Sequence, residues 1–216
     1  MLKESTLDAV DELVHRYTKL SPIARKLREA VTMLCESYYA GGKLLICGNG
    51  GSAADAEHIV GELMKGFLLP RSLPEDVVEK FENVCPEDAA YLAENLQGAL
   101  PAISFVNQTA LNTAFANDQA PELSFAQNVL GLGNAGDVLL GISTSGNSRN
   151  VIYAMQVAKA MEIHTIALTG KTGGKLAELA DITIRVPETA TYRIQEFHLP
   201  IYHMFCIAAE REFFGK

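Results

Sequence analysis

Hydroxyl side chains are most concentrated in the run Ser143-Thr144-Ser145-Gly146-Asn147-Ser148. This run directly follows an apolar stretch, 137–142, and precedes a helical pattern. Hydroxyl and backbone N–H groups donate hydrogen bonds to phosphate oxygens, and the dipole of a helix that begins near Ser148 adds to the attraction. We therefore predict that the loop binds a phosphate group. The alternative is an ordinary Ser/Gly-rich turn with a helix cap.

A second loop, Cys47-Gly48-Asn49-Gly50-Gly51-Ser52-Ala53, follows another short apolar run. Its glycines allow a ligand to approach the backbone, and Ser52 with Asp55 resembles a capping box that opens a helix. The residues from Gly48 to Ala53 match the pattern G-x-G-x-x-A. However, a proline-broken segment stands where a dinucleotide site needs a second strand ending in an acid. We predict a second ligand-binding loop, with a tight turn that binds nothing as the alternative.

Imidazole, carboxylate and amide groups recur in two places that could contribute to one site. His58 and Glu62 are four residues apart, so they share a face of the helix that opens near Ser52. Gln195 and His203 lie on the last helical stretch, 193–213, where their separation corresponds to about 80° around the axis. Pro200 lies between them and is expected to kink that helix. Spacing alone does not bring the two pairs together. The alternatives are a solvated surface pair and a core histidine.

Five short apolar runs predict the strands of a parallel sheet. They alternate with helical patterns, which is typical of an α/β fold with helices on both faces of the sheet. Two more helices are predicted in the first 40 residues, the second restarting at Ser21-Pro22. With no repeat or linker, residues 1–216 are predicted to form a single doubly wound domain. The predicted strands are 43–47, 102–106, 137–142, 165–168 and 182–186.

The segment 68–98 departs from this alternation. It contains three prolines and many acidic residues. Helix starts are predicted at Ser72-Leu73-Pro74-Glu75 and at Pro86-Glu87-Asp88. We interpret the segment as an insertion of short helices at the rim of the sheet.

Composition restricts the class of protein. Apolar residues make up 48% of the chain, which excludes a disordered protein. The 26 acidic and 18 basic residues give a net charge of −8, so no nucleic-acid partner is expected. No run approaches the roughly 18 apolar residues of a membrane span. Residues 1–6 lack the start of a signal peptide, so neither export nor a membrane partner is expected.

The cysteines and the remaining histidines carry no predicted chemistry. The cysteines form no closely spaced pair, so neither a disulfide framework nor a thiolate zinc site is expected. They are Cys35, Cys47, Cys85 and Cys206. His15, His164 and His198 are interpreted as core or surface residues. These features together predict a cytoplasmic protein.

The motifs resemble, in order and spacing, the sugar isomerase (SIS) domain family and, within it, the phosphoheptose isomerases. The resemblance covers nearly the whole chain outside 68–98, and it implies the SIS fold, a five-stranded parallel sheet flanked by helices with an N-terminal helical pair in 1–40. The matching runs are 47–52, His58-x-x-x-Glu62-Leu63, Asn117-Asp118, 136–148, 167–171 and Arg193-Ile194-Gln195-Glu196.

The resemblance implies an aldose–ketose isomerisation, sedoheptulose 7-phosphate to D-glycero-D-manno-heptose 7-phosphate. It implies a cytoplasmic homotetramer with active sites between subunits. It also implies a divalent metal, usually zinc, held by His58, Glu62, Gln195 and His203. Two nitrogen and two oxygen donors suit zinc, although a Gln carbonyl is an uncommon ligand.

The same resemblance assigns a role to each site residue. Glu62 would be the base that moves the proton and would also contact the substrate, and His203 the acid that protonates or polarises the oxygen. Binding the metal and acting as the general base are competing roles for Glu62. The phosphate would be held by Ser52, Ser143, Thr144, Ser145 and Ser148. The sugar hydroxyls would be oriented by Asn49, Gly50, Gly51, Asn117, Asp118 and Gln195.

Two features depart from the family, and two other functions are the alternatives. Tyr192 stands where many members have an acid, and the insertion is expected to border the pocket, so substrate fit or rate is expected to differ. A non-catalytic SIS protein that binds the replication initiator would lack residues matching Glu62 and His203, and both are present. A phosphosugar-binding regulator would carry a DNA-binding helical domain, which the first 40 residues do not resemble.

Overall fold

A computed structural model describes residues 2–215, and the sheet within them has five parallel strands. The strand order is β2-β1-β3-β4-β5, so the chain reverses its direction of winding between β1 and β3. In open α/β sheets, ligands bind at such a switch point, beyond the carboxyl ends of the strands. The strands are β1 (Leu44–Gly48), β2 (Ala102–Ser104), β3 (Val138–Ser143), β4 (His164–Thr169) and β5 (Ile182–Arg185).

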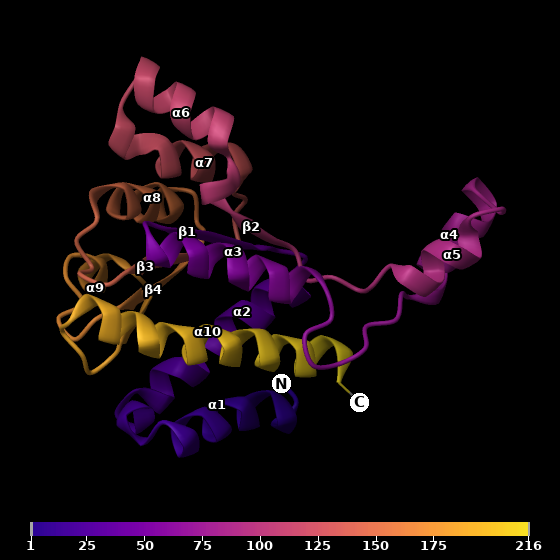
Figure 1. The fold of residues 1–216 in the computed structure, drawn as a ribbon, viewed down its shortest axis with the longest axis horizontal. Coiled ribbons are helices and arrows are strands. Elements are labelled where there is room, and N and C mark those ends of the chain that lie inside the picture. The colour runs from indigo at the N-terminus through magenta and orange to yellow at the C-terminus, as the bar shows by residue number, and fades with distance from the viewer. Residues whose placement is uncertain (1, 216) are drawn as a thin grey trace.

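Helices cover both faces of the sheet, as predicted (Figure 1). Alternate residues of β1 point to opposite faces, Leu44 and Ile46 into one apolar cluster and Leu45 and Cys47 into the other. The first cluster is formed with α1 (Glu4–Arg16), α2 (Ala24–Tyr39), α3 (Gly51–Met64) and α10 (Thr191–Phe214). The second is formed with α7 (Ser124–Leu132), α8 (Arg149–Ala160) and α9 (Leu176–Leu179).

The helices α3 and α10 run side by side in the same direction (Figure 1). Gln195 lies against Gly51 near their first turns, and the rings of His203 and His58 face each other further along. The helix α10 continues through Pro200 without interruption. Pro200 removes the backbone bond to residue 196, which is exposed, so water can satisfy that carbonyl. This arrangement brings both halves of the predicted polar set together.

Two predictions about element ends are corrected by the structure. The helix α3 begins at Gly51, and its N-cap is Gly50, not Ser52. The φ angle of Gly50 is 58°, a left-handed conformation that suits glycine, and Ser52 is buried one residue inside the helix. The strand β2 ends at Ser104 because the chain turns into the 3-10 helix η2 (Phe105–Asn107).

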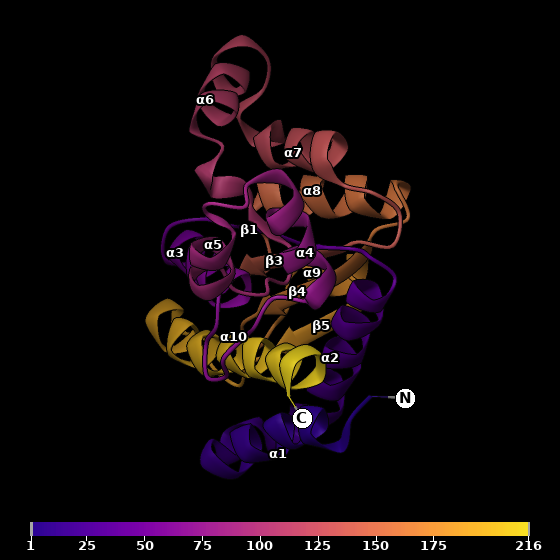
Figure 2. The same cartoon turned by 90° about the vertical axis from the view of Figure 1, so that its right-hand side faces the viewer.

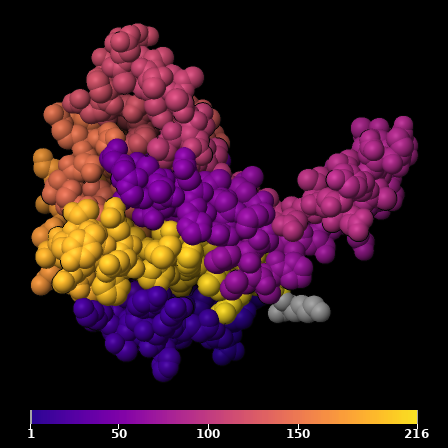
Figure 3. Space-filling model, viewed as in Figure 1, coloured from indigo at the N-terminus to yellow at the C-terminus, as the bar shows by residue number. Residues whose placement is uncertain are grey.

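The inserted segment forms an arm that projects from the body of the protein (Figures 1 and 3). Its helices, α4 (Glu75–Val84) and α5 (Ala89–Asn95), start where predicted and pack against each other. No residue of α4 is buried, and only Ala89 of α5 is. The arm leaves the body between the end of α3 and the start of β2, at the sheet edge opposite the predicted ligand loops. The expectation that the whole insertion borders the pocket is therefore wrong; only its root, residues 66–71, reaches α3.

Three elements remain. One is a 3-10 helix between the first two helices, and the others are an α-helix and a 3-10 helix before α7. Figure 2 shows α6 at the end of the molecule furthest from α1. Within residues 2–215, no helix combines the length and apolar character that a membrane span requires. These elements are η1 (Thr18–Ile23), α6 (Thr109–Asp118) and η3 (Pro121–Leu123).

His198 couples the packing of α10 to pH. It is fully buried, neither ring nitrogen has a partner of good geometry among the described residues, and burial lowers its pKa to about 4. Below pH 6.5 His198 would bind a proton in the unfolded chain but not in the folded chain. Its contribution to the free energy of unfolding is therefore fully present above pH 6.5 and falls toward pH 4. We expect a loss of up to about 3 kcal/mol over this range. Denaturant melts between pH 7 and 4 should show this slope, and His198→Leu should flatten it; an unchanged slope would contradict the assignment.

Candidate active site

The Ser/Thr-rich loop lies where β3 ends and α8 begins. Ser143 Oγ and Ser148 Oγ lie 2.9 Å apart and share a hydrogen bond, and the backbone N–H of Asn147 donates to Ser145 Oγ at 3.1 Å. Gly146 has a φ of 66°, and a Cβ there would collide with the carbonyl of Gly173. The loop thus folds tightly at the start of a helix and is able to bind an anion there. Ser145 is exposed, whereas Ser143 is buried.

The glycine-rich loop after β1 is joined to the Ser/Thr-rich loop by a pair of amides. Asn49 Nδ2 donates to Asn150 Oδ1 at 2.9 Å, and Asn150 Nδ2 donates back to Asn49 Oδ1 at 2.8 Å. A Cβ at Gly51 would collide with the side-chain amide of Gln195, so only glycine allows this close approach. The two predicted loops and Gln195 therefore lie together at the β1/β3 switch point.

Glu62 is held between His58 on α3 and Lys65, the residue that follows the helix. Its Oε1 lies 3.1 Å from Nε2 of His58, and its Oε2 accepts a hydrogen bond from Nζ of Lys65 at 3.3 Å. The predicted His58–Glu62 contact therefore forms, although His58 remains 42% exposed. A carboxylate in this setting is able to accept a proton from a substrate carbon.

His203 brings the second predicted group to the same place. Its ring meets that of His58 edge-on, with centroids 5.0 Å apart. Burial lowers the pKa of His203, nearby His58 lowers it further, and Glu62 opposes both. The shift favours a neutral imidazole, which is able to donate a hydrogen bond to a developing oxyanion. Glu62 and His203, which are far apart in the sequence, thus flank one region between α3 and α10.

The side chains predicted to bind a metal are of the chemical types that bind divalent cations. Nε2 of His203 is buried without a hydrogen-bond partner among the described residues, and His58 and Glu62 supply a further imidazole and a carboxylate. Among residues 2–215, however, no three His, Cys, Asp or Glu side chains are arranged to hold a metal ion. Gln195 lies near the first turn of α3, against Gly51, and not beside His58 and Glu62.

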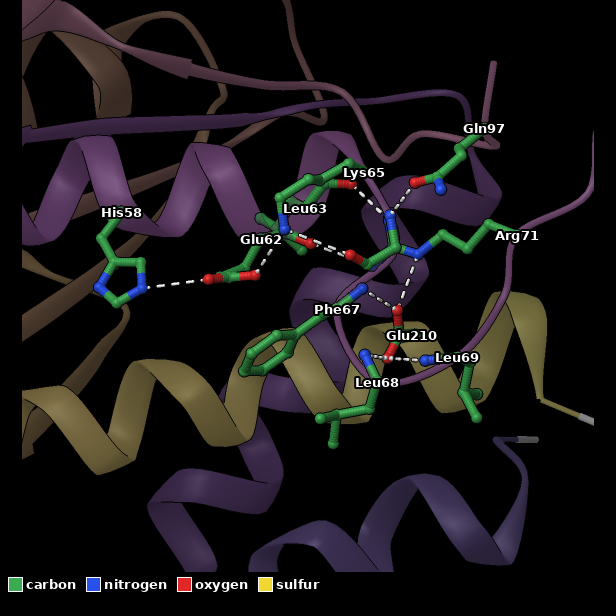
Figure 4. Close-up of polar contacts among 11 residues, drawn as sticks. His58, Glu62, Leu63, Lys65, Phe67, Leu68, Leu69, Arg71, Gln97 and Glu210 are labelled. Atoms are coloured by element: carbon green, nitrogen blue, oxygen red, sulfur yellow. Dashed lines mark hydrogen bonds and ion pairs between the residues drawn. The ribbon is translucent and has the colours of Figure 1, made fainter. Parts of the chain in front are cut away.

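The last turn of α3, which carries Glu62, is fixed by a buried ion pair (Figure 4). Arg71 Nε donates to Glu210 Oε1 at 2.9 Å, and the two side chains are 0% and 1% exposed. Arg71 also donates to the backbone carbonyls of Leu63 and Glu62, at 2.6 and 3.0 Å. Glu210 further accepts from the backbone N–H groups of residues 67, 68 and 69. The root of the arm therefore caps the helix that presents the candidate base.

Not every predicted residue reaches this region. Asn117 and Asp118 are exposed at the end of α6, which packs mainly against η3 and α7 and lies far from α10 in both views (Figures 1 and 2). Tyr192 is 59% exposed in the first turn of α10, where Arg193 lies over its ring. Glu62 is ten residues beyond Ser52, about 15 Å along the helix axis. The phosphate loop and the candidate base are thus at different ends of α3.

Sequence reasoning missed several residues of this region. Lys65 could have been found because it is only three residues beyond Glu62 in the sequence, at the C-cap of α3. Asn150, Tyr202, Arg71 and Glu210 carry no local signal, because their partners are distant in the sequence. The distances between partners range from 101 to 144 residues for the pairs Asn49–Asn150, Arg71–Glu210 and His58–Tyr202.

Comparisons with known proteins agree with this geometry. Two family models described as SIS domain match residues 103–205 and 7–98. A phosphoheptose isomerase of Akkermansia muciniphila is 34% identical over 203 residues, 94% of each chain. One of Helicobacter pylori is 40% identical over 91% of this chain and 89% of its own. The solved phosphoheptose isomerase of Francisella tularensis superposes with a TM-score of 0.75 at 30% identity, covering 96% and 94% of the two chains.

Proposed function

The chain belongs to the SIS domain family, in its phosphoheptose isomerase branch, and from this premise we propose that it interconverts sedoheptulose 7-phosphate and D-glycero-D-manno-heptose 7-phosphate. The chain is a phosphosugar isomerase, an aldose–ketose isomerase, and the two other hypotheses are not favoured. The main observation that supports the proposal is that Glu62 and His203 both lie beside His58, although their helices are far apart in the sequence.

The reaction requires one proton to move between adjacent carbons. Glu62 would remove a proton from C1 of the ketose, and the electron pair would form the C1–C2 double bond of an enediolate. The same carboxyl group would return the proton to C2, and the proton of the C1 hydroxyl would pass to the C2 oxygen, so that C1 becomes the aldehyde carbon and C2 carries a hydroxyl. A carboxylate positioned in this way contributes typically about 10²- to 10⁴-fold to the rate.

His203 would stabilise the oxygen that becomes negatively charged. Its lowered pKa favours the neutral ring, whose single N–H would donate a hydrogen bond to the C2 oxygen. Lys65 lies on the other oxygen of Glu62 and would keep this carboxylate oriented. The chain thus supplies a base, a donor and an orienting cation from α3 and α10.

We propose that the phosphate binds at the switch point and the sugar extends from it. Ser143, Thr144, Ser145 and Ser148 would hold the phosphate, with Ser52 beside them but buried. Asn49, Gly50, Gly51 and Gln195 would orient the hydroxyls. Asn117 and Asp118 stay proposed sugar contacts, although α6 lies away from α10 in this chain.

A divalent metal, with zinc as the proposed ion, would be held by His58, Glu62, Gln195 and His203. When bound it would act as a Lewis acid toward the sugar oxygens. The buried, unpartnered Nε2 of His203 supports this proposal. Elemental analysis and assays in chelator test it: full activity with no bound metal would remove the ion from the proposal.

We further propose a cytoplasmic homotetramer with active sites between subunits. Large apolar side chains are exposed on both helices that form the site, Met64 at 45% on α3 and Leu199 at 43% on α10, and His58 is 42% exposed. The separation of the phosphate loop from Glu62 along α3 also favours a site completed by a second subunit. Light scattering of the purified protein tests the assembly, where a monomer would contradict it, and cell fractionation tests the location.

A panel of sugar phosphates tests the function directly. We expect turnover of sedoheptulose 7-phosphate, with the aldose 7-phosphate identified as product. Ser145→Ala combined with Ser148→Ala should raise KM about tenfold or more, because hydrogen bonds to a charged group contribute about 1.5–3 kcal/mol each. Ser72→Ala, an exposed serine just beyond the arm root, is the matched control. No turnover of any phosphosugar would exclude the function, and an unchanged KM would exclude the phosphate loop.

A further inference from the structure

A pair of asparagine amides joins the two ligand loops. Asn49 directly follows β1 in the glycine-rich loop and is exposed, and Asn150 is half-buried in the first turn of α8. Nδ2 of Asn49 donates to Oδ1 of Asn150 at 2.9 Å, and Nδ2 of Asn150 donates to Oδ1 of Asn49 at 2.8 Å. Each side chain thus gives the other one hydrogen bond and accepts one in return.

A backbone N–H decides which way round this pair lies. If both amides were turned over, each would still donate one hydrogen bond and accept one, so the pair alone allows two orientations. The N–H of Val151 donates to Oδ1 of Asn150 at 3.0 Å. This N–H is in the first turn of α8, where no helix carbonyl can accept from it, and Val151 itself is fully buried. Turning the Asn150 amide over would place an N–H against this N–H, so the observed orientation is the one that Val151 allows.

The orientation passes from Asn150 to Asn49. The backbone of Asn49 is held as well, because its carbonyl accepts from the N–H of Ser52 at 3.1 Å. Within the pair, the Asn49 amide keeps one free hydrogen on Nδ2 and one free lone pair on Oδ1, and turning it over would exchange this donor and this acceptor. We propose that Asn150 is a positioning residue that fixes the Asn49 amide in one orientation, so that the glycine-rich loop presents a defined donor and a defined acceptor to the sugar hydroxyls.

This inference deepens the proposed function and rests on it, because Asn49 is one of the residues proposed to orient the sugar. A hydroxyl group donates and accepts, whereas ionised phosphate oxygens only accept. An Asn49 amide that was free to turn would match the sugar in only part of the molecules, and the apparent affinity falls with that fraction. Loss of Asn150 should therefore weaken the binding of a phosphosugar but not that of phosphate alone.

Titration calorimetry with sedoheptulose 7-phosphate and with inorganic phosphate separates the two effects. Asn150→Ala should weaken binding of the sugar about 3- to 10-fold, the contribution of one hydrogen bond between uncharged groups, and leave phosphate within about twofold. Asn150→Asp keeps an acceptor for Val151 but has no N–H for Asn49. Its charge weakens both ligands, yet the ratio of the two dissociation constants should change as in Asn150→Ala. In an Asn49→Ala background, Asn150→Ala should add nothing further.

The orientation itself can be read without a ligand. In nitrogen-15-labelled protein, the side-chain NH2 signals are assigned by their loss in Asn49→Ala and Asn150→Ala. One hydrogen of each amide should be protected from exchange with water, and this protection should disappear when the other asparagine is replaced. The N–H of Val151 should show no strong nuclear Overhauser effect to the NH2 of Asn150, because the carbonyl oxygen faces it.

Asn95→Ala is the matched control, because it removes an amide that donates to a backbone carbonyl within the arm, and it should leave both affinities unchanged. Equal weakening of both ligands in Asn150→Ala, or a strong Overhauser effect between Val151 and the NH2 of Asn150, would overturn the inference. If the phosphosugar is turned over but the ratio of affinities does not change, the proposed function stands and the inference fails. If the spectra and the ratio are as expected but no phosphosugar is turned over, the positioning role stands and the proposed function fails.

Discussion

Glu62→Gln is expected to lower kcat about 10³-fold while the protein stays folded. The glutamine side chain has the same shape but cannot take a proton from C1, so the proposed base is lost. The backbone carbonyl of residue 62 keeps its hydrogen bond from Arg71, and the side chain, which is 14% exposed, lies between His58 and Lys65. Initial rates with the heptulose phosphate and a thermal melt measure the two effects separately.

The matched control for this prediction is Glu57→Gln. Glu57 lies on the same helix and is exposed. This variant should keep both rate and stability. If Glu62→Gln turned over substrate within about tenfold of the unmodified protein, Glu62 would not be the base. A loss of rate accompanied by unfolding would instead assign Glu62 a structural role.

Glu210→Ala is expected to destabilise the fold by about 3–5 kcal/mol, because it leaves the guanidinium of Arg71 buried without its counter-charge. Both side chains are almost completely buried, and Glu210 also accepts from three backbone N–H groups in the arm root. A loss of this size is a large part of the stability of a typical domain. Denaturant unfolding followed by far-UV circular dichroism measures it.

Two variants make the prediction for Glu210 specific. Glu210→Gln keeps one acceptor oxygen and the side-chain volume, so its loss should be smaller than that of the alanine variant. Asp76→Asn breaks the exposed Asp76–Lys80 pair on α4 and should change stability by less than about 1 kcal/mol. Equal losses in Glu210→Ala and Asp76→Asn would show that the buried pair does not hold the arm root to α3.

The buried pair also explains how an arm with few buried side chains is attached. Arg71 and Glu210 join the arm root, the end of α3 and the last turns of α10 at one point (Figure 4). The aromatic ring of Phe214 lies under Arg71, 4.7 Å from its guanidinium carbon, and contacts Gly98 on the returning chain. Both ends of the arm are therefore held by the C-terminal turn of α10.

The elements and their order follow from local sequence patterns. Apolar runs predicted all five strands, because a strand buried on both faces must be apolar throughout. Proline and acidic residues located the starts of α4 and α5 in the arm. The Ser/Thr-rich and glycine-rich loops were found because both the strand before and the helix after each loop have a local pattern. The prediction of Ser52 as N-cap was wrong because Gly50 reaches a backbone conformation that local capping rules do not anticipate.

Which groups far apart in the sequence meet depends on how the helices pack. Helical spacing predicted the His58–Glu62 pair, but it contains no information about the register of α3 against α10, which places His203 and Tyr202 beside His58. The direction of the arm was likewise undetermined, since the short apolar stripes of α4 and α5 pack against each other and need no contact with the sheet. Periodicity reports which face of a helix is apolar, whereas the partner of that face depends on packing across the whole chain.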